Sequence, residues 1–517
     1  NLPIGTGDIV TTTEPQNLAN KTLELAGHTG TIAQLITYAA TGDFDTLPDN
    51  SVVWAGGCPF LKEDGAEYEG LPVGFTLALD YVHPKWWGGT WNGTANDTAV
   101  LRRAHAFANA VRKPITCAGI ESFGIERAAR ISVQTSWHLA GAKWRFVDGL
   151  LSGTSFDVTD VTAAFVVEDP DTPAVVATVT VGSGTGQIPA ASLVAGSTRP
   201  TAGYWDGPGY VRIASGGTVY AAARYLGGGT MVYEQPFWLS PEGLAVWPLE
   251  ADLSADTTVT ITRRANSAHG QIEISGIVLD VSTCNCQTLL EIARNQVSIH
   301  HMSFVGAMPA YHRHGLIRIL DAGAVTLDDM PLHAFDNDPN VSSRPFNFRG
   351  ASEVRMSRII AQDGWGQLGT AVVSGLYLTD SSVNRIDCHD WGFNFFSDNC
   401  SFEQWGGYFG TGGGWWKFTN CQVNDVKAVL RHREDFDGAA FNMNVVIENP
   451  GVRDPDSAAR ILDWSTYPVG SPAAVINLPN TITVKNMVRK SDTGVANTNT
   501  ITRAVSVAVA SNAAGVY

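Results

Sequence analysis

Apolar and polar residues alternate along much of the chain after residue 271, and this predicts short β-strands at intervals of roughly twenty residues. Residues 383–396, VNRIDCHDWGFNFF, show the pattern, because Arg385, Asp387 and His389 alternate with apolar side chains. Side chains two residues apart on a strand point to the same side of the sheet. The pattern therefore predicts an outward surface that carries Arg, Asp and His together above a buried apolar layer.

The same region repeats a turn phrase. Asp or Asn takes the second position in TDSSV, DNCSF, TNCQV and ENPGV, at Asp380, Asn399, Asn420 and Asn449, which are 19, 21 and 29 residues apart. SIHHMSF, residues 298–304, is an earlier member. A strand, an Asn or Asp turn and another strand, repeated about every 20 residues, is typical of a parallel β-helix. A β-sandwich also has periodic strands, but it does not require a recurring turn residue. We expect residues 271–485 to form stacked parallel coils, with Asn399 and Asn420 at equivalent turns.

One long helix is predicted before this repeat. Asp97 or Thr98 can cap a helix that runs to about Lys113, and Pro114 would end it. The apolar positions with helical spacing are Val100, Ala104, Phe107, Ala108 and Val111. No other segment gives a comparable helical pattern, so we expect an all-β protein with a single prominent helix.

These patterns divide the chain into five parts. Residues 150–270 contain β-branched runs separated by Pro, Gly and Asp turns, and they predict an inserted β-domain. The other parts are an N-terminal β-rich attachment or neck region at 1–82, the start of the β-helix with its capping helix at 83–149, the parallel β-helix at 271–490 and a C-terminal β segment at 491–517.

Composition supports this picture and limits the partners. Gly is abundant, with 53 residues, and only 16% of residues are charged, which favours a turn-rich β protein over a helical one. The net charge of −16 would repel phosphates, so we expect no binding to nucleic acid, whereas neutral or weakly charged polymers fit more easily. No apolar run approaches ~20 residues, so we expect no insertion into a membrane. The first ten residues lack the basic and apolar regions of a secretory signal.

Cysteine and histidine patterns give no clear metal site. The seven Cys are odd in number and scattered, so we expect buried free thiols. Cys284 and Cys286 lack a second ligand pair for zinc, and YHRHG at 311–315 lacks a third ligand. FDNDPN, with Asp336 and Asp338, lacks the distal Glu of a calcium loop. We therefore expect neither a metal nor another cofactor.

The segment WGGTWNGTANDTAVLRRAHAFA, residues 87–108, resembles the opening of the pectate-lyase-like β-helix domain of phage tailspikes. That opening reads roughly F-G-A-x-G-D-G-x-x-D-D-T and is followed by a capping helix. The matching residues are Gly88, Gly93, Asp97 and Thr98, with Trp87 at the aromatic position and Asn92 and Asn96 in place of two Asp. The resemblance implies a right-handed parallel β-helix, usually a homotrimer, that is attached to a virion and cleaves surface polysaccharide.

A second segment, residues 376–450, resembles colanic-acid-degrading tailspikes and related phage β-helix proteins. Their R-x-D-x-H motif, Gly-rich turn and L-R-x-D-Y-G motif correspond here to RIDCH at 385–389, GTGGGWW at 410–416 and LRHREDFDG at 430–438. Extra residues leave Arg431 and Arg433 as alternatives for the family's Arg position. This resemblance implies a bacterial surface polysaccharide as the partner and a virion tail or secreted location.

The same segments hold the candidate active-site chemistry. Asp and Glu can act as general acid and base, His can position them or carry the proton, and Arg can bind sugar hydroxyls or carboxylates. The candidate catalytic residues are Asp387, His389, Asp390, Glu403, Glu434 and Asp435, and the candidate substrate-binding residues are Arg385, Trp391, Trp405, Tyr408, Trp415, Trp416, Arg431 and Arg433. The same charges could instead form a solvated surface or a loop of salt bridges, and the aromatics an internal stack or a trimer interface.

Coil spacing bears on the reaction. Coils stack at ~4.8 Å, so groups two coils apart lie ~10 Å apart. Retaining glycosidases need carboxyls ~5 Å apart, and inverting ones ~6.5–9.5 Å. Asp387 or Asp390 against Glu434 or Asp435 falls nearer the inverting range, while Glu403 on the intervening coil offers a closer partner. Endo-acting glycoside hydrolysis is therefore the leading hypothesis.

Two other functions remain open at this level. A polysaccharide lyase needs a base and a group that neutralises a uronate carboxylate, and His389 with Arg385 and Arg431 could supply both. Only Lys417 and Lys427 lie between 271 and 484, which disfavours a lysine base. A non-catalytic receptor-binding spike would need the aromatic residues but neither the acid nor the base.

Overall fold

The computed structural model describes residues 22–24, 52–55, 58–62, 75–77, 79–148, 163–217, 221–223, 230–283, 288–306, 316–332, 345–361, 368–403, 405–423, 428–432, 440–453, 460–465, 479–486, 488–490 and 505–508. A small sheet near the N-terminus joins β1 (Thr22–Glu24), β2 (Val52–Ala55), β3 (Cys58–Lys62) and β4 (Phe75–Leu77) in that order. Within the described part of the chain, no helix is long and apolar enough to cross a membrane.

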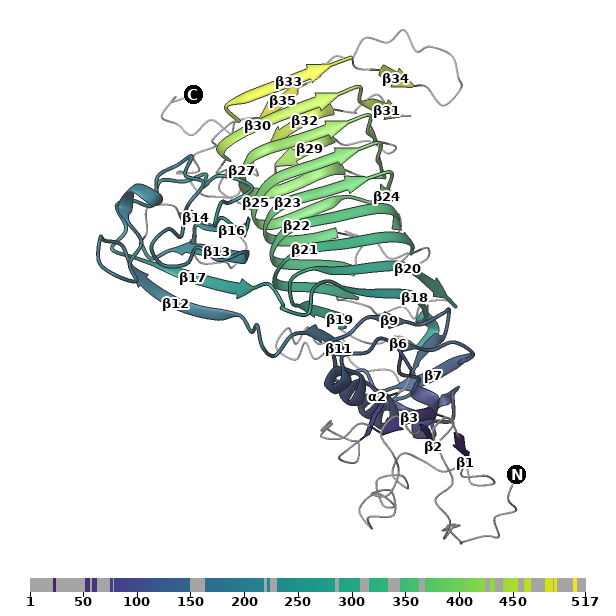
Figure 1. The fold of residues 1–517 in the computed structure, drawn as a ribbon. Helices are drawn as coiled ribbons and strands as arrows, with labels where there is room; N and C mark the ends of the chain where they lie inside the picture. The colour runs from purple at the N-terminus through teal and green to yellow at the C-terminus, as the bar shows by residue number, and fades with distance from the viewer. Residues whose placement is uncertain are drawn as a thin grey trace.

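Most of the described strands belong to one sheet that winds upward in stacked coils (Figure 1). Each long strand pairs in parallel with the strand one coil later, as β22 does with β23 and β23 with β25. The predicted fold class, an all-β protein built on a parallel β-helix, is confirmed.

The β-helix begins with η1 (Pro84–Trp87), β5 (Asn92–Asn96), α2 (Thr98–Val111), β6 (Ile115–Thr116), β7 (Ser122–Ile125), β8 (Ile131–Val133), β9 (Trp137–His138), β10 (Lys143–Phe146) and β11 (Ala163–Glu168). It continues with β18 (Ile272–Asp280), η3 (Val281–Thr283), β19 (Thr288–Ala293), β20 (Val297–Val305), β21 (Ile317–Pro331), β22 (Phe346–Ala361), β23 (Leu368–Thr379), β24 (Ser382–Val383), β25 (Ile386–Asp398), β26 (Ser401–Phe402), β27 (Trp405–Thr419) and β28 (Gln422–Val423). The last coils contain β29 (Ala428–His432), β30 (Ala440–Glu448), β31 (Gly451–Arg453), β32 (Arg460–Ser465), β33 (Thr481–Lys485), β34 (Val488–Lys490) and β35 (Val505–Ala508).

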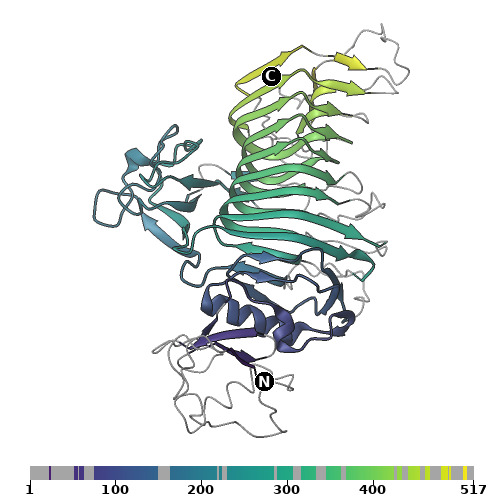
Figure 2. The same ribbon diagram turned by 45° about the vertical axis from the view of Figure 1, so that its right-hand side comes forward.

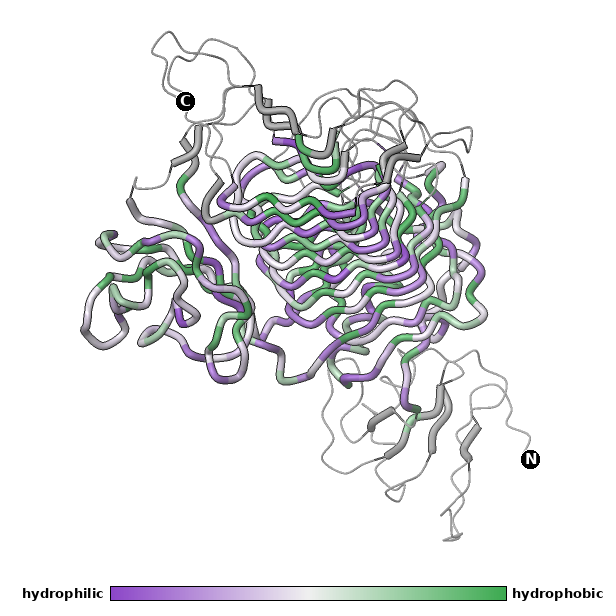
Figure 3. The backbone as a smooth tube through the Cα atoms, turned by 90° about the horizontal axis from the view of Figure 1, so that it is seen from above, coloured by the Kyte–Doolittle hydropathy of each residue, from purple (hydrophilic) through white to green (hydrophobic). Residues whose placement is uncertain are grey.

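Inward-facing side chains form the core because each coil places the same strand position above the last. Phe346, Leu368 and Ile386 occupy consecutive rungs of one column, and all are buried. Seen along the helix axis, apolar and polar residues alternate around the coils (Figure 3). One coil cannot bury its inner side alone, so stacking is what stabilises the fold.

A ladder of left-handed residues explains the recurring turn phrase. Its rungs are His301, Asp329, Arg358, Asp380, Asn399, Asn420, Asn449 and Asn486, all with φ between 48° and 56°. Asn and Asp adopt this conformation more readily than most residues. Asn399 Nδ2 donates to Asp380 Oδ1 (2.7 Å), and Asn449 Nδ2 donates to Asn420 Oδ1 (2.9 Å). The predicted equivalence of the turns at Asn399 and Asn420 is confirmed.

The predicted helix is α2, and it covers the lower end of the coils (Figure 2). It ends at Val111, two residues before the expected Lys113. Asp97 occupies the N-cap position, but its side chain makes no capping bond. It instead accepts hydrogen bonds from the backbone N–H groups of Thr90 (2.9 Å) and Gly124 (3.2 Å). Asp97 thus ties two loops of the cap together.

The inserted domain forms a separate antiparallel sheet beside the β-helix (Figures 1 and 2). Its strands are β12 (Val175–Thr180), β17 (Thr258–Ala265), β13 (Gly209–Ser215) and β16 (Glu234–Leu239) in spatial order, with a separate hairpin of β14 (Ala221–Ala223) and β15 (Thr230–Val232) and a short helix η2 (Ala190–Ser192). The sequence-based division placed β11 in this domain, but β11 pairs in parallel with β8 and β19 and so belongs to the β-helix.

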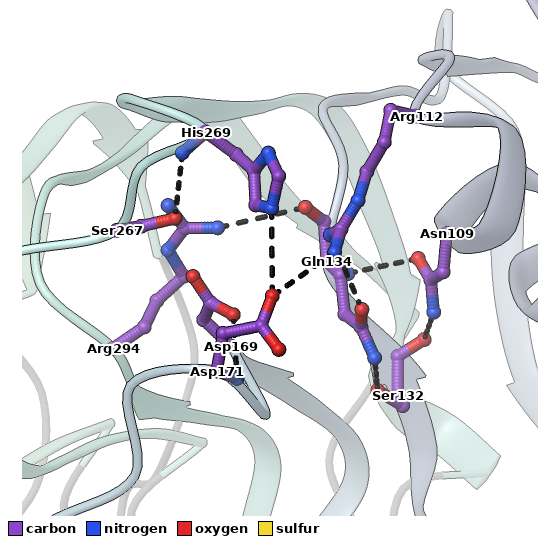
Figure 4. Close-up of polar contacts among 9 residues, drawn as sticks. All are labelled: Asn109, Arg112, Ser132, Gln134, Asp169, Asp171, Ser267, His269 and Arg294. Atoms are coloured by element: carbon purple, nitrogen blue, oxygen red, sulfur yellow. Dashed lines mark hydrogen bonds and ion pairs between the residues drawn. The ribbon is translucent and has the colours of Figure 1, made fainter.

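The two connections of the inserted domain meet near the C-terminal end of α2 (Figure 4). Arg112 donates to Gln134 Oε1 and to Asp171 Oδ2, both at 3.4 Å, and His269 Nε2 lies 3.5 Å from the same Asp171 oxygen. Arg294 also donates to the backbone oxygen of Gln134 (3.5 Å). Asp171 lies on the way into the domain and His269 on the way out, so the insertion starts and ends at one place.

Several predictions about cysteines and metals can be compared with the described residues. Cys117, Cys388, Cys400 and Cys421 are buried free thiols, as expected. Cys284, Cys286, the YHRHG segment at 311–315, Asp336 and Asp338 lie outside the described residues.

Candidate functional site

The candidate site occupies three neighbouring coils. Asp387 on β25 pairs in register with Tyr408 on β27, and Tyr408 pairs with Arg431 on β29. Their neighbours in sequence, including Ile386 and Leu430, point into the core. Asp387, Tyr408 and Arg431 therefore form one outward column, because successive side chains on a strand alternate in direction.

Asp387 joins Arg385 and His389 into one cluster. Its Oδ2 lies 3.3 Å from a guanidinium nitrogen of Arg385 and 3.3 Å from His389 Nε2. The side chains of Asp387 and Arg385 are 0% and 2% exposed, whereas that of His389 is 17% exposed. A buried carboxylate requires such partners, since unpaired burial of a charge is costly. Asp387 is therefore placed to fix the orientation of the imidazole.

Tyr408 lies between two guanidinium groups. The guanidinium carbon of Arg385 is 5.1 Å from its ring centroid, and that of Arg431 is 5.7 Å away. Both distances fall within the range of a cation–π contact. Tyr408 is buried, so its ring supports the two Arg residues.

The expected open surface of Arg, Asp and His is not what the structure shows. Arg385 and Asp387 point away from the core, yet both are buried. The alternative of an ordinary solvated surface does not hold for these two residues, because outward direction on a strand does not guarantee exposure once side chains from adjacent coils pack over it. His389 keeps partial access to solvent.

Besides Tyr408, two of the candidate aromatic residues have structural positions. Trp391 is buried, and its Nε1 donates to the backbone oxygen of Val232 in the inserted domain (2.7 Å). Trp416 lies in the core, with its ring centroid 4.4 Å from that of Phe395. The prediction that both bind sugar is therefore wrong, because neither indole is accessible to a polymer. Of the candidate aromatic side chains that are described, Trp415 has the most solvent access, at 46%.

Some of the remaining candidates lie within the described residues and others lie outside them. Asp390 and Glu403 are half-buried, and the backbone N–H of Glu403 donates to the oxygen of Val383 (3.2 Å) where the chain turns toward β27. Arg433, Glu434 and Asp435 lie outside the described residues, and only the backbone of Trp405 is described.

Two carboxyl groups that the sequence did not single out lie where the inserted domain meets the β-helix. Glu353 accepts hydrogen bonds from Trp247 Nε1 (2.9 Å) and from the Tyr377 hydroxyl (3.4 Å), and burial raises its pKa. Burial also raises the pKa of Glu250 to about 7. No motif marked these residues, because only the packing of the two domains buries them.

No protein-family model and no curated protein matches this sequence. Among solved structures, the chain is similar to the tailspike gp61 of Pseudomonas phage phi297, with 9% identity, a TM-score of 0.41 and coverage of 80% of this chain and 75% of that chain. It is also similar to the tailspike gp49 of Pseudomonas phage LKA1, with 10% identity, a TM-score of 0.38 and coverage of 79% and 77%. A third similar structure is the gp54 tailspike of Acinetobacter baumannii bacteriophage AP22, solved with an A. baumannii capsular saccharide, with 10% identity, a TM-score of 0.28 and coverage of 79% and 76%.

The chain thus resembles phage tailspikes in its fold. At these identities and TM-scores, the likeness carries no inference about activity, which depends on the residues of the site itself.

Proposed function

We propose that this chain is a tailspike-like depolymerase that cleaves a bacterial surface polysaccharide by endo-acting hydrolysis. One observation carries the proposal: a partly exposed His389 is held by the buried Asp387, which Arg385 pairs with in turn. An oriented imidazole beside guanidinium groups suits proton transfer and binding of a polar polymer. The motif resemblance of residues 376–450 points to the same chemistry.

We assign each role according to how far the side chain is exposed to a bound polymer. Asp387 is a positioning residue, because a side chain with no exposure is out of reach of a polymer. His389 contacts and orients the sugar, and Arg431 binds a sugar hydroxyl or carboxylate. We assign the acid and base for hydrolysis to one carboxyl from Asp390 or Glu403 and one from Glu434 or Asp435. One carboxyl protonates the leaving glycosidic oxygen, while the other removes a proton from the attacking water.

Binding of the polymer adds a second contact further along β27, at Trp415. Trp415 is exposed, and an exposed indole can stack on the apolar face of a sugar ring. We propose that Trp415 contributes affinity rather than rate, since a ground-state contact stabilises substrate and transition state alike.

A lyase reaction is the second candidate, and the contact between Asp387 and His389 favours it. A carboxylate that holds an imidazole stabilises the cation that forms when the imidazole takes a proton. His389 would then remove the proton next to a uronate carboxyl group, and Arg431 would neutralise that carboxylate. Lyases leave an unsaturated uronate at the new chain end, whereas hydrolases do not.

The test is incubation of the full chain with purified capsular polysaccharides, with reducing ends and the ultraviolet absorbance of unsaturated uronate followed in parallel. We expect new reducing ends without that absorbance for hydrolysis. His389→Ala should lower the rate ~10²–10⁴-fold. The matched control is His300→Ala, because His300 is also partly exposed and lies 3.6 Å from a carboxylate, that of Asp328.

Each outcome has a clear meaning. Absorbance that rises with reducing ends would replace hydrolysis by the lyase reaction. A polysaccharide that binds tightly but is never shortened would leave the receptor-binding spike as the function. Equal loss of activity in both histidine variants would show that His389 has no special role.

A further inference from the structure

The inserted domain contacts the β-helix along a line that we call the docking seam. From the inserted domain it contains Tyr210, Arg212, Trp238, Trp247 and Glu250, and from the β-helix it contains Asp321, Gly323, Gly350, Glu353, Gly375, Tyr377, Asn394, Phe396 and Gly414. The seam runs up one corner of the β-helix across several coils. The strand β16 supplies most of the contact from the inserted side.

Glycines at this corner allow the close approach. A Cβ at Gly323 would lie 2.7 Å from the Trp238 ring, and one at Gly375 would lie 3.1 Å from Trp247 Nε1. Gly350, Gly375 and Gly414 also have positive φ, which side chains tolerate poorly. Gly323 and Gly375 therefore leave room for the side chains of Trp238 and Trp247.

The lower half of the seam contains groups that keep one charge state near neutral pH. The Tyr210 hydroxyl donates to Asp321 Oδ1 (3.1 Å), and Arg212 Nε lies 3.2 Å from the same carboxylate. Burial alone would lower the pKa of Arg212, but Tyr210, Asp321 and Glu234 together raise it above its ordinary value. Arg212 therefore remains a cation, and Arg264 adds a hydrogen bond to the backbone oxygen of Asp321 (2.9 Å).

The upper half of the seam contains Glu353 and Glu250. Glu353 is faced by Trp247 from the inserted domain, by Tyr377 on β23 and by Arg355 on its own strand, at 3.5 Å. Burial raises the pKa of Glu353 more than the hydrogen bond from Trp247, the charge of Arg355 and the hydrogen bond from Tyr377 lower it.

Glu250 is buried against the β-helix in the same way. Its Oε1 lies 3.0 Å from the position a Cβ would take at Gly414, next to the side chain of Asn394. From β16, Gln235 Oε1 accepts the backbone N–H of Glu250 (2.9 Å). Burial is the cause of the rise in its pKa from 4.5 to about 7.

Docking adds to this burial. Trp247 of the inserted domain covers Glu353, and the corner at Gly414 covers Glu250. Separation of the two surfaces would return both carboxyls toward water and toward their ordinary pKa. The docked state then binds more protons than the undocked state between pH 4.5 and about 7. By linkage, docking is strongest below the ordinary pKa and weakens as the pH rises toward 7.

We propose that the docking seam is a proton-linked switch: its upper half closes when Glu250 and Glu353 are protonated and loosens when they ionise, while the contacts at Asp321 hold the inserted domain in place. The proposal does not depend on polysaccharide cleavage. It concerns how firmly the two domains are held together, and either kind of tailspike-like activity is compatible with it.

Hydrogen exchange of the full chain from pH 5 to pH 8 tests the switch, with each peptide's rate corrected for the intrinsic pH dependence of exchange. Peptides that cover β16 and residues 245–253 should lose protection as the pH rises. For a pKa moved from 4.5 to about 7, linkage limits the change from Glu250 to ~70-fold between pH 5 and pH 8. Peptides from β19, which contributes no residue to the docking seam, should show a much smaller change.

Variants assign the effect to the two carboxyls. Glu250→Gln and Glu353→Gln keep the shape of a protonated carboxyl group, so each should flatten the pH dependence. Glu242→Gln is the matched control, because Glu242 belongs to the same domain but is exposed, and it should leave the dependence unchanged.

Three results would overturn the switch. They are constant protection in the unmodified chain across this range, a full pH dependence in the Glu250→Gln Glu353→Gln double variant, and the same flattening in Glu242→Gln. If one single variant does not fold, the other provides the same comparison.

Discussion

At the scale of single residues, Asp387 is the candidate-site residue whose charged group is completely buried. It lies between Arg385 and His389, and neither its carboxylate nor the Arg385 guanidinium has appreciable access to water. Replacement of a buried charge leaves its partner uncompensated, which typically destabilises a fold by about 3–5 kcal/mol. The role of Asp387 is thus structural as well as functional.

We predict that Asp387→Asn lowers the unfolding temperature and reduces kcat for polymer cleavage by at least ~10², because the imidazole of His389 loses its anchor. Thermal unfolding and initial rates measure the two effects. Asp390→Asn, one strand position beyond His389 and half-buried, should keep the unfolding temperature. An Asp387→Asn protein with unchanged stability would show that the charge pair with Arg385 contributes nothing to the fold.

At the scale of elements, the capping helix α2 carries a group that limits acid stability. His105 is fully buried against Trp137, with ring centroids 4.5 Å apart, and neither ring nitrogen has a hydrogen-bond partner among the described residues. Burial lowers the pKa of His105 from 6.5 to about 3. Its folded pKa is depressed, so the unfolded chain binds the proton more readily below pH 6.5.

We predict that the protein loses roughly 3 kcal/mol of stability through His105 alone between pH 7 and pH 4. His105→Phe should remove this loss, because Phe fits an aromatic environment and does not titrate. Denaturant unfolding at both pH values gives the difference. The idea fails if the variant and the parent lose the same stability on acidification.

The turn ladder and the docking seam show what sequence can and cannot predict at this scale. Asn399 and Asn420 were predictable because a left-handed turn selects Asn or Asp locally and the coil length repeats it. The alternation of side chains correctly predicts that Arg385 and Asp387 point outward. Their burial, however, depends on side chains from other coils. Glu353 is buried by a residue of the inserted domain, and that relation leaves no periodic signal in the sequence.

At the scale of the whole molecule, assembly into a homotrimer stays a prediction from the motif resemblance. Light scattering at micromolar concentration should give three times the 55.2 kDa of one chain. A mass of one chain would contradict it. The exposed edge strand β12, where Val176 is 66% exposed, is a surface that such an assembly could cover.

The shared starting and ending point of the inserted domain has an evolutionary consequence. The strand pairing of the β-helix passes from β11 directly to β19 and from β10 to β18, so the coils need no residue of the insertion to keep their register. A different domain could therefore replace this one by recombination at two neighbouring points. Trp391 and Phe393 would constrain the exchange, because they pack with the core of the inserted domain. Any replacement domain would pack against these two side chains, so it would need an apolar surface that matches them.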